Sequence, residues 1–160
     1  KRTLDAVAEA GIAVVALPLC NLYLQDRGAG TPRRRGVTLL HEMKARGIPV
    51  AVASDNTRDP FYAYGDLDAL EVFRAAVRIA HLDHPFADWV RTVTATPAAL
   101  MGLDERGVVR PGAPADLVLF EGRSFSEVLS RPESRRLVIR RGRASDAAPP
   151  AYRDLDALFD

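Results

Sequence analysis

The chain has 160 residues, and its 22 Lys and Arg side chains almost balance its 21 Asp and Glu side chains, so that the formal net charge is +1. Charged residues make up 27% of the chain and hydrophobic residues 48%, as in an ordinary globular domain. This balance argues against a nucleic-acid-binding protein, which concentrates positive charge on one face. The longest apolar run covers residues 11–20 and is too short for a membrane span, which needs about 20 residues.

Cysteine usage and the start of the chain bear on its compartment. Cys20 is the single cysteine, so the chain forms no internal disulfide and no cysteine cage for a metal, which fits a reducing and therefore cytoplasmic compartment. The sequence begins at Lys1 in a helix-like segment without a signal peptide, and we expect the natural N-terminus to lie upstream. The length allows one domain or pieces of two, and the order of the elements favours pieces.

The first third of the chain is expected to alternate helices with strands. Helical spacing over residues 4–11 precedes a continuous apolar run at 12–17, and helical spacing over 37–47 precedes a second run at 50–53. An apolar run without alternation is typical of a strand buried on both faces, in a parallel sheet that helices cover. This order predicts an α/β fold.

Helices are then expected up to residue 102. We expect a long helix from Asp66 to Leu82 with an apolar stripe of Leu67, Leu70, Phe73, Val77 and Ala80, a shorter helix around Trp89, and a helix that the pair Thr96-Pro97 opens and Gly102 ends.

Beyond Gly102, short apolar segments alternate with Gly and Pro, which predicts a small β-rich subdomain. We expect strands at 108–109, 117–120 and 137–140, a tight hairpin at Arg141-Gly142, a short helix at 124–130 and a marginal helix at 154–159. Asp116 stands at the start of the second of these strands and is interpreted as structural.

Asp55 is the first candidate for a catalytic residue. It follows the apolar run at 50–53 almost directly, and ligands of parallel α/β proteins bind at the carboxyl ends of the strands. A carboxylate at that place needs a metal, a hydrogen-bond network or solvent, because burying it unpaired is costly. The pattern alone leaves a turn or a helix cap as the alternative.

The histidines and an arginine run are weaker candidates. His81 and His84 have a three-residue spacing that metal ligands also use, but they lie at the end of a helix before a proline. We interpret them as surface residues and His41 as partly buried packing. The three arginines at 33–35 are interpreted as a solvated face rather than a nucleic-acid site.

Two segments resemble the C-terminal signature of the amidohydrolase superfamily: TATPAALMGL at 94–103 and GVVRPGAPADLVLF at 107–120. In that superfamily the signature joins the last helix of a metal-bearing (β/α)₈ barrel to a small flanking β-sandwich. The segment LPLCNLYLQ at 17–25 is similar to the segment after the seventh barrel strand in cytosine deaminases. SDN at 54–56, with DPFY at 59–62, resembles the end of their eighth strand.

The resemblance implies that Asp55 binds a catalytic divalent metal, zinc or iron, and accepts a proton from its water. The metal lowers the pKa of that water, so that hydroxide attacks a ring carbon bearing an amino group and ammonia leaves. Many cytosine-specific relatives have His-Asp-Asp where this chain has Ser54-Asp55-Asn56. Because an amide both donates and accepts, we expect Asn56 to contact the substrate and influence which ring is accepted. Phe61 and Tyr62 either wall the substrate pocket or pack against the long helix.

The resemblance therefore implies that residues 1–102 form the last two strands and helices of a barrel, and that residues 103–160 form part of the flanking β-rich subdomain and a C-terminal tail. The family's metal site also needs a His-x-His pair and further histidines, which this sequence lacks, and a complete barrel takes about 250 residues. We expect one metal ligand in this chain and no complete active site. Unpaired strand edges favour self-association, so we also expect a homo-oligomer.

The function implied by the resemblance is deamination of cytosine or a related cyclic amidine, a small-molecule substrate. Two alternatives stay open. One is an amidohydrolase that acts on another ring, such as an amino- or alkylamino-triazine or creatinine. The other is a non-catalytic α/β domain used for binding or assembly.

Overall fold

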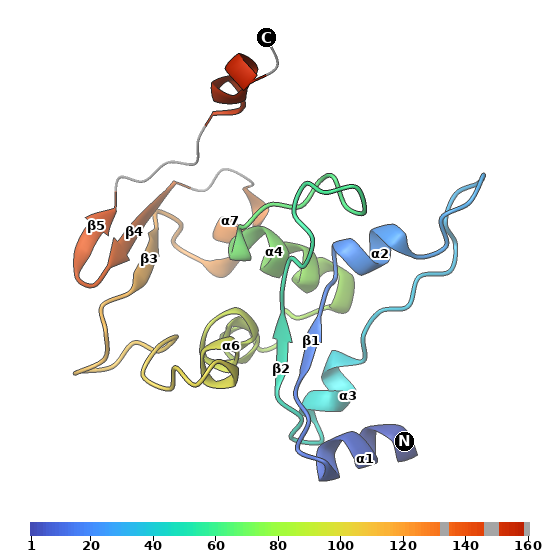
Figure 1. Ribbon diagram of the computed structural model, residues 1–160. Coiled ribbons are helices and arrows are strands. Elements are labelled where there is room, and N and C mark those ends of the chain that lie inside the picture. Colours follow the sequence, from blue (N-terminus) through green and yellow to red (C-terminus); the bar gives the residue numbers. More distant parts are fainter. Residues whose placement is uncertain (132–134, 146–150, 159–160) are drawn as a thin grey trace.

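The computed structural model describes residues 1–131, 135–145 and 151–158. Two sheets organise these residues (Figure 1). Strands β1 (Val14–Ala16) and β2 (Val50–Val52) form a parallel pair, and β3 (Leu117–Phe120), β4 (Arg136–Arg140) and β5 (Arg143–Ser145) form an antiparallel sheet in that order. The mixed α/β class expected from the sequence is confirmed. Within the described ranges, no helix has the length and apolar character of a membrane span.

Helices make up most of the remaining regular structure of the described residues. They are α1 (Arg2–Glu9), α2 (Cys20–Leu24), α3 (Leu40–Lys44), α4 (Ala69–Ala80), α5 (Phe86–Trp89), α6 (Ala95–Leu100) and α7 (Phe125–Ser130), together with the 3-10 helices η1 (Val90–Val93) and η2 (Tyr152–Leu158). Helices α3, α4, α6 and η1 all contact β2. The marginal terminal helix expected at 154–159 is therefore a 3-10 helix, and residue 159 lies outside the described residues.

The parallel pair is shorter than the apolar runs predicted. Val14 faces Val50 and Ala16 faces Val52 in the register, and the ladder ends with a 3.0 Å hydrogen bond from the Ala53 N–H to the Ala16 carbonyl. All three residues of β2 are buried, as expected for a strand covered on both faces, whereas Val15 of β1 is 49% exposed. Among the described residues, pairing thus involves residues 14–16 of the first run and residues 50–52 of the second.

The core lies where β1, β2, α4 and the segment around η1 meet. Its buried members are Ala16, Leu40, Ile48, Val50, Val52, Val72, Phe73, Ala76, Leu82, Trp89 and Leu129. Each large apolar side chain that is fully buried contributes about 1.5–3 kcal/mol to the free energy of unfolding. This cluster therefore stabilises the arrangement of the strands. Leu129 belongs to α7, which ties the C-terminal part of the chain to the same core.

Helix α4 begins at Ala69, three residues later than predicted. The Asp68 carboxylate accepts a hydrogen bond from the Leu70 N–H at 2.9 Å and so caps the helix. As a result Leu67 lies outside the helix and is 84% exposed, although the sequence placed it on the apolar stripe. Phe73 is buried in the core as expected.

Two further expectations about local structure were wrong. Residues 108–109 form no strand, and Val109 is 87% exposed, because the segment pairs with no other strand among the described residues. Helix α6 starts after Thr94, not after Thr96, and the Thr94 hydroxyl donates to the Val90 carbonyl at 3.0 Å. The helix boundary is thus set by the preceding 3-10 turn rather than by the Thr96-Pro97 pair.

The predicted hairpin between β4 and β5 is confirmed. Arg141 and Gly142 have φ angles of 50° and 77°, both left-handed, as a two-residue hairpin turn requires. The Asp116 carboxylate accepts the Arg141 N–H at 2.8 Å and also pairs with Arg106. Asp116 therefore anchors the hairpin tip, which agrees with the structural role assigned to it.

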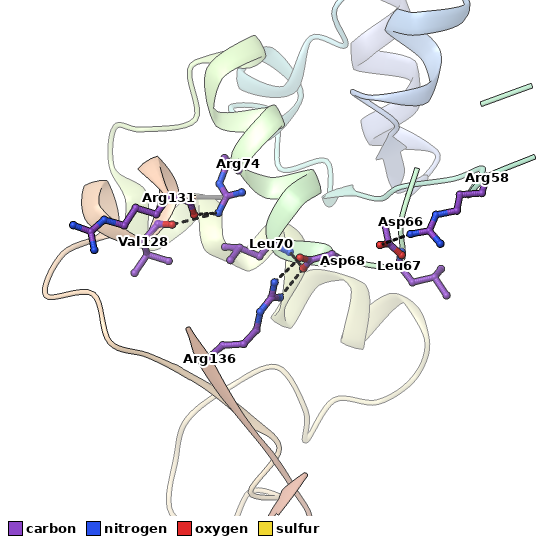
Figure 2. A network of polar contacts seen from close by, with 9 residues as sticks. All are labelled: Arg58, Asp66, Leu67, Asp68, Leu70, Arg74, Val128, Arg131 and Arg136. Atoms are coloured by element: carbon purple, nitrogen blue, oxygen red, sulfur yellow. Dashed lines mark hydrogen bonds and ion pairs between the residues drawn. The ribbon is translucent and has the colours of Figure 1, made fainter. Parts of the chain in front are cut away.

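Helix α4 also holds α7 through two arginines. Arg74 Nη2 donates to the carbonyls of Val128 and Arg131 (Figure 2). Arg78 Nη2 donates to the Leu129 carbonyl at 2.9 Å. These carbonyls lie at the C-terminal end of α7, where the helix dipole is negative and cations are favourable.

At its other end, α4 holds β4. Arg136 Nη1 and Nη2 bind the two carboxylate oxygens of Asp68 at 2.9 and 2.7 Å, a fork-to-fork pair (Figure 2). The same carboxylate caps α4. Asp68 therefore links the start of the helix to the C-terminal sheet.

Replacing Asp68 by Asn should keep an oxygen that caps α4 while removing the charge that pairs with Arg136. We expect the free energy of unfolding to fall by about 1 kcal/mol, because both side chains are still near one-third exposed (30% and 33%). Asp68→Ala also loses the cap and should cost about 1 kcal/mol more. Urea denaturation measures both values, and a double-mutant cycle with Arg136→Gln isolates the pair. Equal losses for the Asn and Ala variants would contradict the capping role.

The same contact predicts a pH dependence. Hydrogen bonds from Arg136, and to a lesser extent its charge, hold the pKa of the Asp68 carboxyl below its ordinary value. A carboxyl with a lowered folded pKa stabilises the fold above its unfolded pKa of about 3.9, and this stabilisation is lost as the pH falls through the folded pKa. The stability difference between the unsubstituted protein and Asp68→Asn should be constant near neutral pH and shrink in acid. A difference that grows below about pH 4 would contradict this assignment.

Candidate functional site

Asp55 lies just beyond the carboxyl end of β2, as the sequence predicted. Its side chain is exposed, and its φ angle of 62° is left-handed. Asp tolerates this conformation better than most residues other than glycine, although it is still uncommon. The chain therefore turns sharply after β2 and presents the carboxylate to solvent at the edge where both parallel strands end.

Asn56 joins the loop after β2 to the loop after β1. Its Oδ1 accepts a hydrogen bond from the Cys20 thiol at 3.3 Å, and its Nδ2 donates to the Asp59 carboxylate. Cys20 is the first residue of α2 and is fully buried. The side-chain amide thus bridges two segments that are 36 residues apart in sequence.

The protonation of both partners suits these hydrogen bonds. Burial raises the pKa of the Cys20 thiol, and the neighbouring carboxylates of Asp55 and Asp59 act in the same direction. The thiol therefore keeps its proton and can donate it. The hydrogen bond from the Asn56 amide, followed by the backbone N–H of Tyr62, lowers the pKa of Asp59, which is an ionised acceptor at neutral pH.

Asp59 also organises the turn after it. Its Oδ1 accepts the backbone N–H groups of Phe61 and Tyr62, each at 2.9 Å, and its own N–H donates to the Tyr62 carbonyl at 3.3 Å. This is an Asx-type turn, in which a short carboxylate replaces a backbone acceptor. As a result the two aromatic side chains have different environments. Phe61 is 66% exposed, and Tyr62 is 6% exposed.

Tyr62 packs against other tyrosines rather than facing solvent. Its ring lies edge-on to Tyr23 of α2, with 5.3 Å between ring centroids, and Tyr64 is 5.6 Å from Tyr23. Arg27 lies over the Tyr23 ring at 4.8 Å. Tyr62 therefore belongs to a cluster with Tyr64 and Tyr23 of α2, next to the Asn56 bridge, whereas Phe61 is exposed.

The predicted residues Asp55, Asn56, Phe61 and Tyr62 all lie in the loop between β2 and α4. The three histidines lie outside this loop. His81 ends α4 in a left-handed conformation, and the His84 side chain is 91% exposed.

His41 is exposed, so the prediction that it is partly buried was wrong. Its Nε2 lies 2.9 Å from the Ala80 carbonyl, and its ring lies edge-on to the buried Trp89.

Sequence reasoning missed the roles of Cys20 and Asp59. Cys20 is buried, and nothing local in the sequence indicates that its thiol has a partner 36 residues away. Asp59-Pro60 is a turn signature that could have identified the Asp59 carboxylate as a backbone acceptor.

Asp55 is the side chain of the loop that lies beyond β2 and suits a metal ligand. The exposed Asp55 carboxylate is an oxygen donor of the kind that zinc and iron accept. Within residues 1–131, 135–145 and 151–158, no group of three or more His, Cys, Asp and Glu side chains is arranged to hold a metal ion. The described residues therefore fit one ligand of a metal site and do not form a complete one.

Comparisons with known proteins relate nearly the whole chain to one family. The sequence model of the amidohydrolase family matches residues 1–145. A pterin deaminase from Rhizobium rhizogenes is 62% identical over 158 residues, which cover 98% of this chain and 36% of that protein.

Solved structures show the same relationship in three dimensions. The 5-methylcytosine deaminase from Klebsiella pneumoniae with 5-fluorocytosine superposes with a TM-score of 0.74 at 26% identity, over 96% of this chain and 38% of that one. The N-isopropylammelide isopropylaminohydrolase from Burkholderia multivorans gives a TM-score of 0.69 at 27% identity, over 89% of this chain and 34% of that one. The chain spans about a third of the length of the proteins it matches.

The loop that carries Asp55 depends on a close backbone approach at Gly65. A Cβ atom at this position would lie 2.2 Å from the Asn56 carbonyl oxygen and 2.9 Å from Tyr62 Cδ1. We expect Gly65→Ala to lower the free energy of unfolding by about 1–3 kcal/mol, because the backbone carbonyl must move. Gly28→Ala is the matched control, since nothing lies within 4 Å of a Cβ there, and should change stability by less than about 0.5 kcal/mol. Thermal denaturation measures both, and equal effects would contradict the close approach.

Proposed function

Because the chain belongs to the amidohydrolase family, we propose that it is part of a hydrolase that removes the amino group of a pterin-type ring. One observation carries this proposal: an exposed carboxylate, Asp55, lies at the carboxyl end of β2 in a chain that is 62% identical to a pterin deaminase over 158 residues. Cytosine, the ring expected from the sequence, is a related substrate and the weaker candidate, because the protein that acts on 5-methylcytosine is 26% identical.

In this proposal, residues 1–102 contribute the last two strands of a (β/α)₈ barrel and residues 103–160 contribute part of a flanking subdomain. The parallel pairing of β1 with β2 and the complete burial of β2 support the barrel. The antiparallel order of β3, β4 and β5 supports a separate β-rich part. A homo-oligomer, expected from the strand edges, stays a prediction.

The chemistry is hydrolysis of a carbon–nitrogen bond. The divalent metal, zinc or iron, would be held in part by Asp55 and, when bound, activates water at neutral pH. Asp55 accepts a proton from the attacking water and passes it to the amino nitrogen of the ring. A carbon–oxygen bond forms at the ring carbon, the carbon–nitrogen bond breaks, and ammonia leaves.

The loop after β2 also contributes to substrate binding in this proposal. Phe61 exposes its ring beside the Asp59 turn and offers an apolar face on which a flat heterocycle can stack. Tyr62, the next residue, is buried and fixes this segment by packing against Tyr23 of α2. Asn56 contributes hydrogen-bonding groups that influence which ring is accepted.

A second candidate is an alkylamino-triazine, which also carries an exocyclic nitrogen on a ring carbon. The match to an isopropylaminohydrolase at 27% identity and a TM-score of 0.69 supports it. Product analysis distinguishes the two, because a pterin releases ammonia whereas an N-isopropyl triazine releases isopropylamine.

Replacing Asp55 by Ala in the complete enzyme should lower ammonia release from pterin by several orders of magnitude, because a ligand and a proton acceptor are lost together. Asp55→Asn keeps the shape of the side chain and should be impaired similarly, since an amide accepts no proton. The control is Asp104→Ala, which changes an exposed aspartate of the Leu103–Arg106 turn. Elemental analysis measures the metal retained by each variant. Activity of Asp55→Ala above about a tenth of the unsubstituted enzyme would contradict the assignment.

A further inference from the structure

The two ends of the Asn56 side-chain amide bind different partners. Oδ1 accepts from the Cys20 thiol at 3.3 Å, and Nδ2 donates to the Asp59 carboxylate. A carboxylate accepts hydrogen bonds and donates none, whereas a thiol is a weak donor whose sulfur is also only a weak acceptor. The reversed amide would place its oxygen against the carboxylate and its N–H groups against the thiol proton. The two partners together therefore select one orientation of the amide.

Both partners are themselves held in place. The backbone N–H groups of Phe61 and Tyr62 bind Asp59 Oδ1, each at 2.9 Å, so the carboxylate cannot swing away from the turn without losing both bonds. Cys20 is fully buried at the start of α2. A hydrogen bond to an ionised group is about twice as strong as a neutral one, so Asp59 has the larger influence on the orientation.

The oriented amide keeps capacity to bind a ligand. An amide side chain has two N–H donors and two oxygen lone pairs. Across the described residues, the hydrogen bonds of the Asn56 side chain use one of each. One donor and one acceptor remain on a partly exposed side chain that directly follows Asp55. A lactam edge, which is a ring N–H beside a carbonyl, has the complementary pattern.

We propose that Asp59 and Cys20 are positioning residues that orient the Asn56 amide to bind the lactam edge of the substrate ring. This inference rests on the proposed function, because it concerns ring recognition in the loop beside Asp55. It makes Asp59, which acts through Asn56, a determinant of which ring the enzyme accepts.

The test compares pterin with 2,4-diaminopteridine in the complete enzyme. The two compounds share the fused ring and the 2-amino group, but the second has no lactam edge. In Asp59→Asn the new amide still accepts the backbone N–H groups of the turn, yet it can also donate to Asn56, so both orientations of Asn56 become possible. We expect the ratio of kcat/KM for pterin to that for 2,4-diaminopteridine to fall by about tenfold, mainly through KM. The melting temperature and metal content should stay unchanged.

Three variants serve as controls. Asp66→Asn changes an exposed carboxylate of the same loop that accepts the Leu67 N–H at 2.8 Å, and its ratio should stay within about twofold of the unsubstituted enzyme. Cys20→Ser keeps a donor toward Asn56 and should retain the ratio, whereas Cys20→Ala removes the donor and should lower it. Dissociation constants of the two pteridines, measured by calorimetry on metal-depleted enzyme, should show the same pattern without any turnover.

A change in the ratio smaller than about twofold for Asp59→Asn, or an equal change for Asp66→Asn, would overturn the inference. Equal losses of kcat/KM for both pteridines would also overturn it, because they would indicate a merely structural role of Asp59. If the unsubstituted enzyme deaminates neither compound, the proposed function fails, and the ratio of the two dissociation constants still tests the orientation of Asn56. Binding of neither pteridine would overturn the inference as well.

Discussion

The parallel pairing of β1 with β2 is the constraint on which the candidate site depends. Parallel strands end at the same edge of their sheet, so the loops after them meet there even though they are far apart in sequence. The register that pairs Ala16 with Val52 brings the start of α2 beside the loop after β2. The hydrogen bond between Cys20 and Asn56 is the direct consequence. A slip of this register would separate the Cys20 and Asn56 side chains. The loop that carries Asp55 would then lose its hydrogen bond to α2.

Helix α4 carries this arrangement to the rest of the chain. Its buried face, which includes Val72 and Phe73, packs into the core with β2. Its polar residues hold the C-terminal elements. Asp68 binds β4 at the start of the helix, and Arg74 binds carbonyls at the end of α7 (Figure 2). Arg78 binds the Leu129 carbonyl of α7. Apolar burial supplies most of the stabilisation, whereas these directed contacts determine where the C-terminal elements lie.

Sequence patterns predicted the elements whose signals are local. The two parallel strands, of which β2 alone is fully buried, the hairpin at Arg141-Gly142 and the helix after Ser124 each depend on neighbouring residues, and all are present. The resemblance to amidohydrolases identified the family and drew attention to Asp55. The pairing of Asp68 with Arg136 and the bridge at Asn56 could not be predicted, because they depend on partners 68 and 36 residues away. Single-sequence periodicity contains no information about such pairs.

The central claim is that the turn after β2 presents Asp55 to a catalytic metal. A crystal structure of the complete, metal-loaded enzyme tests it most directly. The account predicts a carboxylate oxygen of Asp55 at about 2.0–2.2 Å from a zinc ion, with Asn56 still between Cys20 and Asp59. A metal fully coordinated by other residues, with Asp55 outside its shell, would contradict the account.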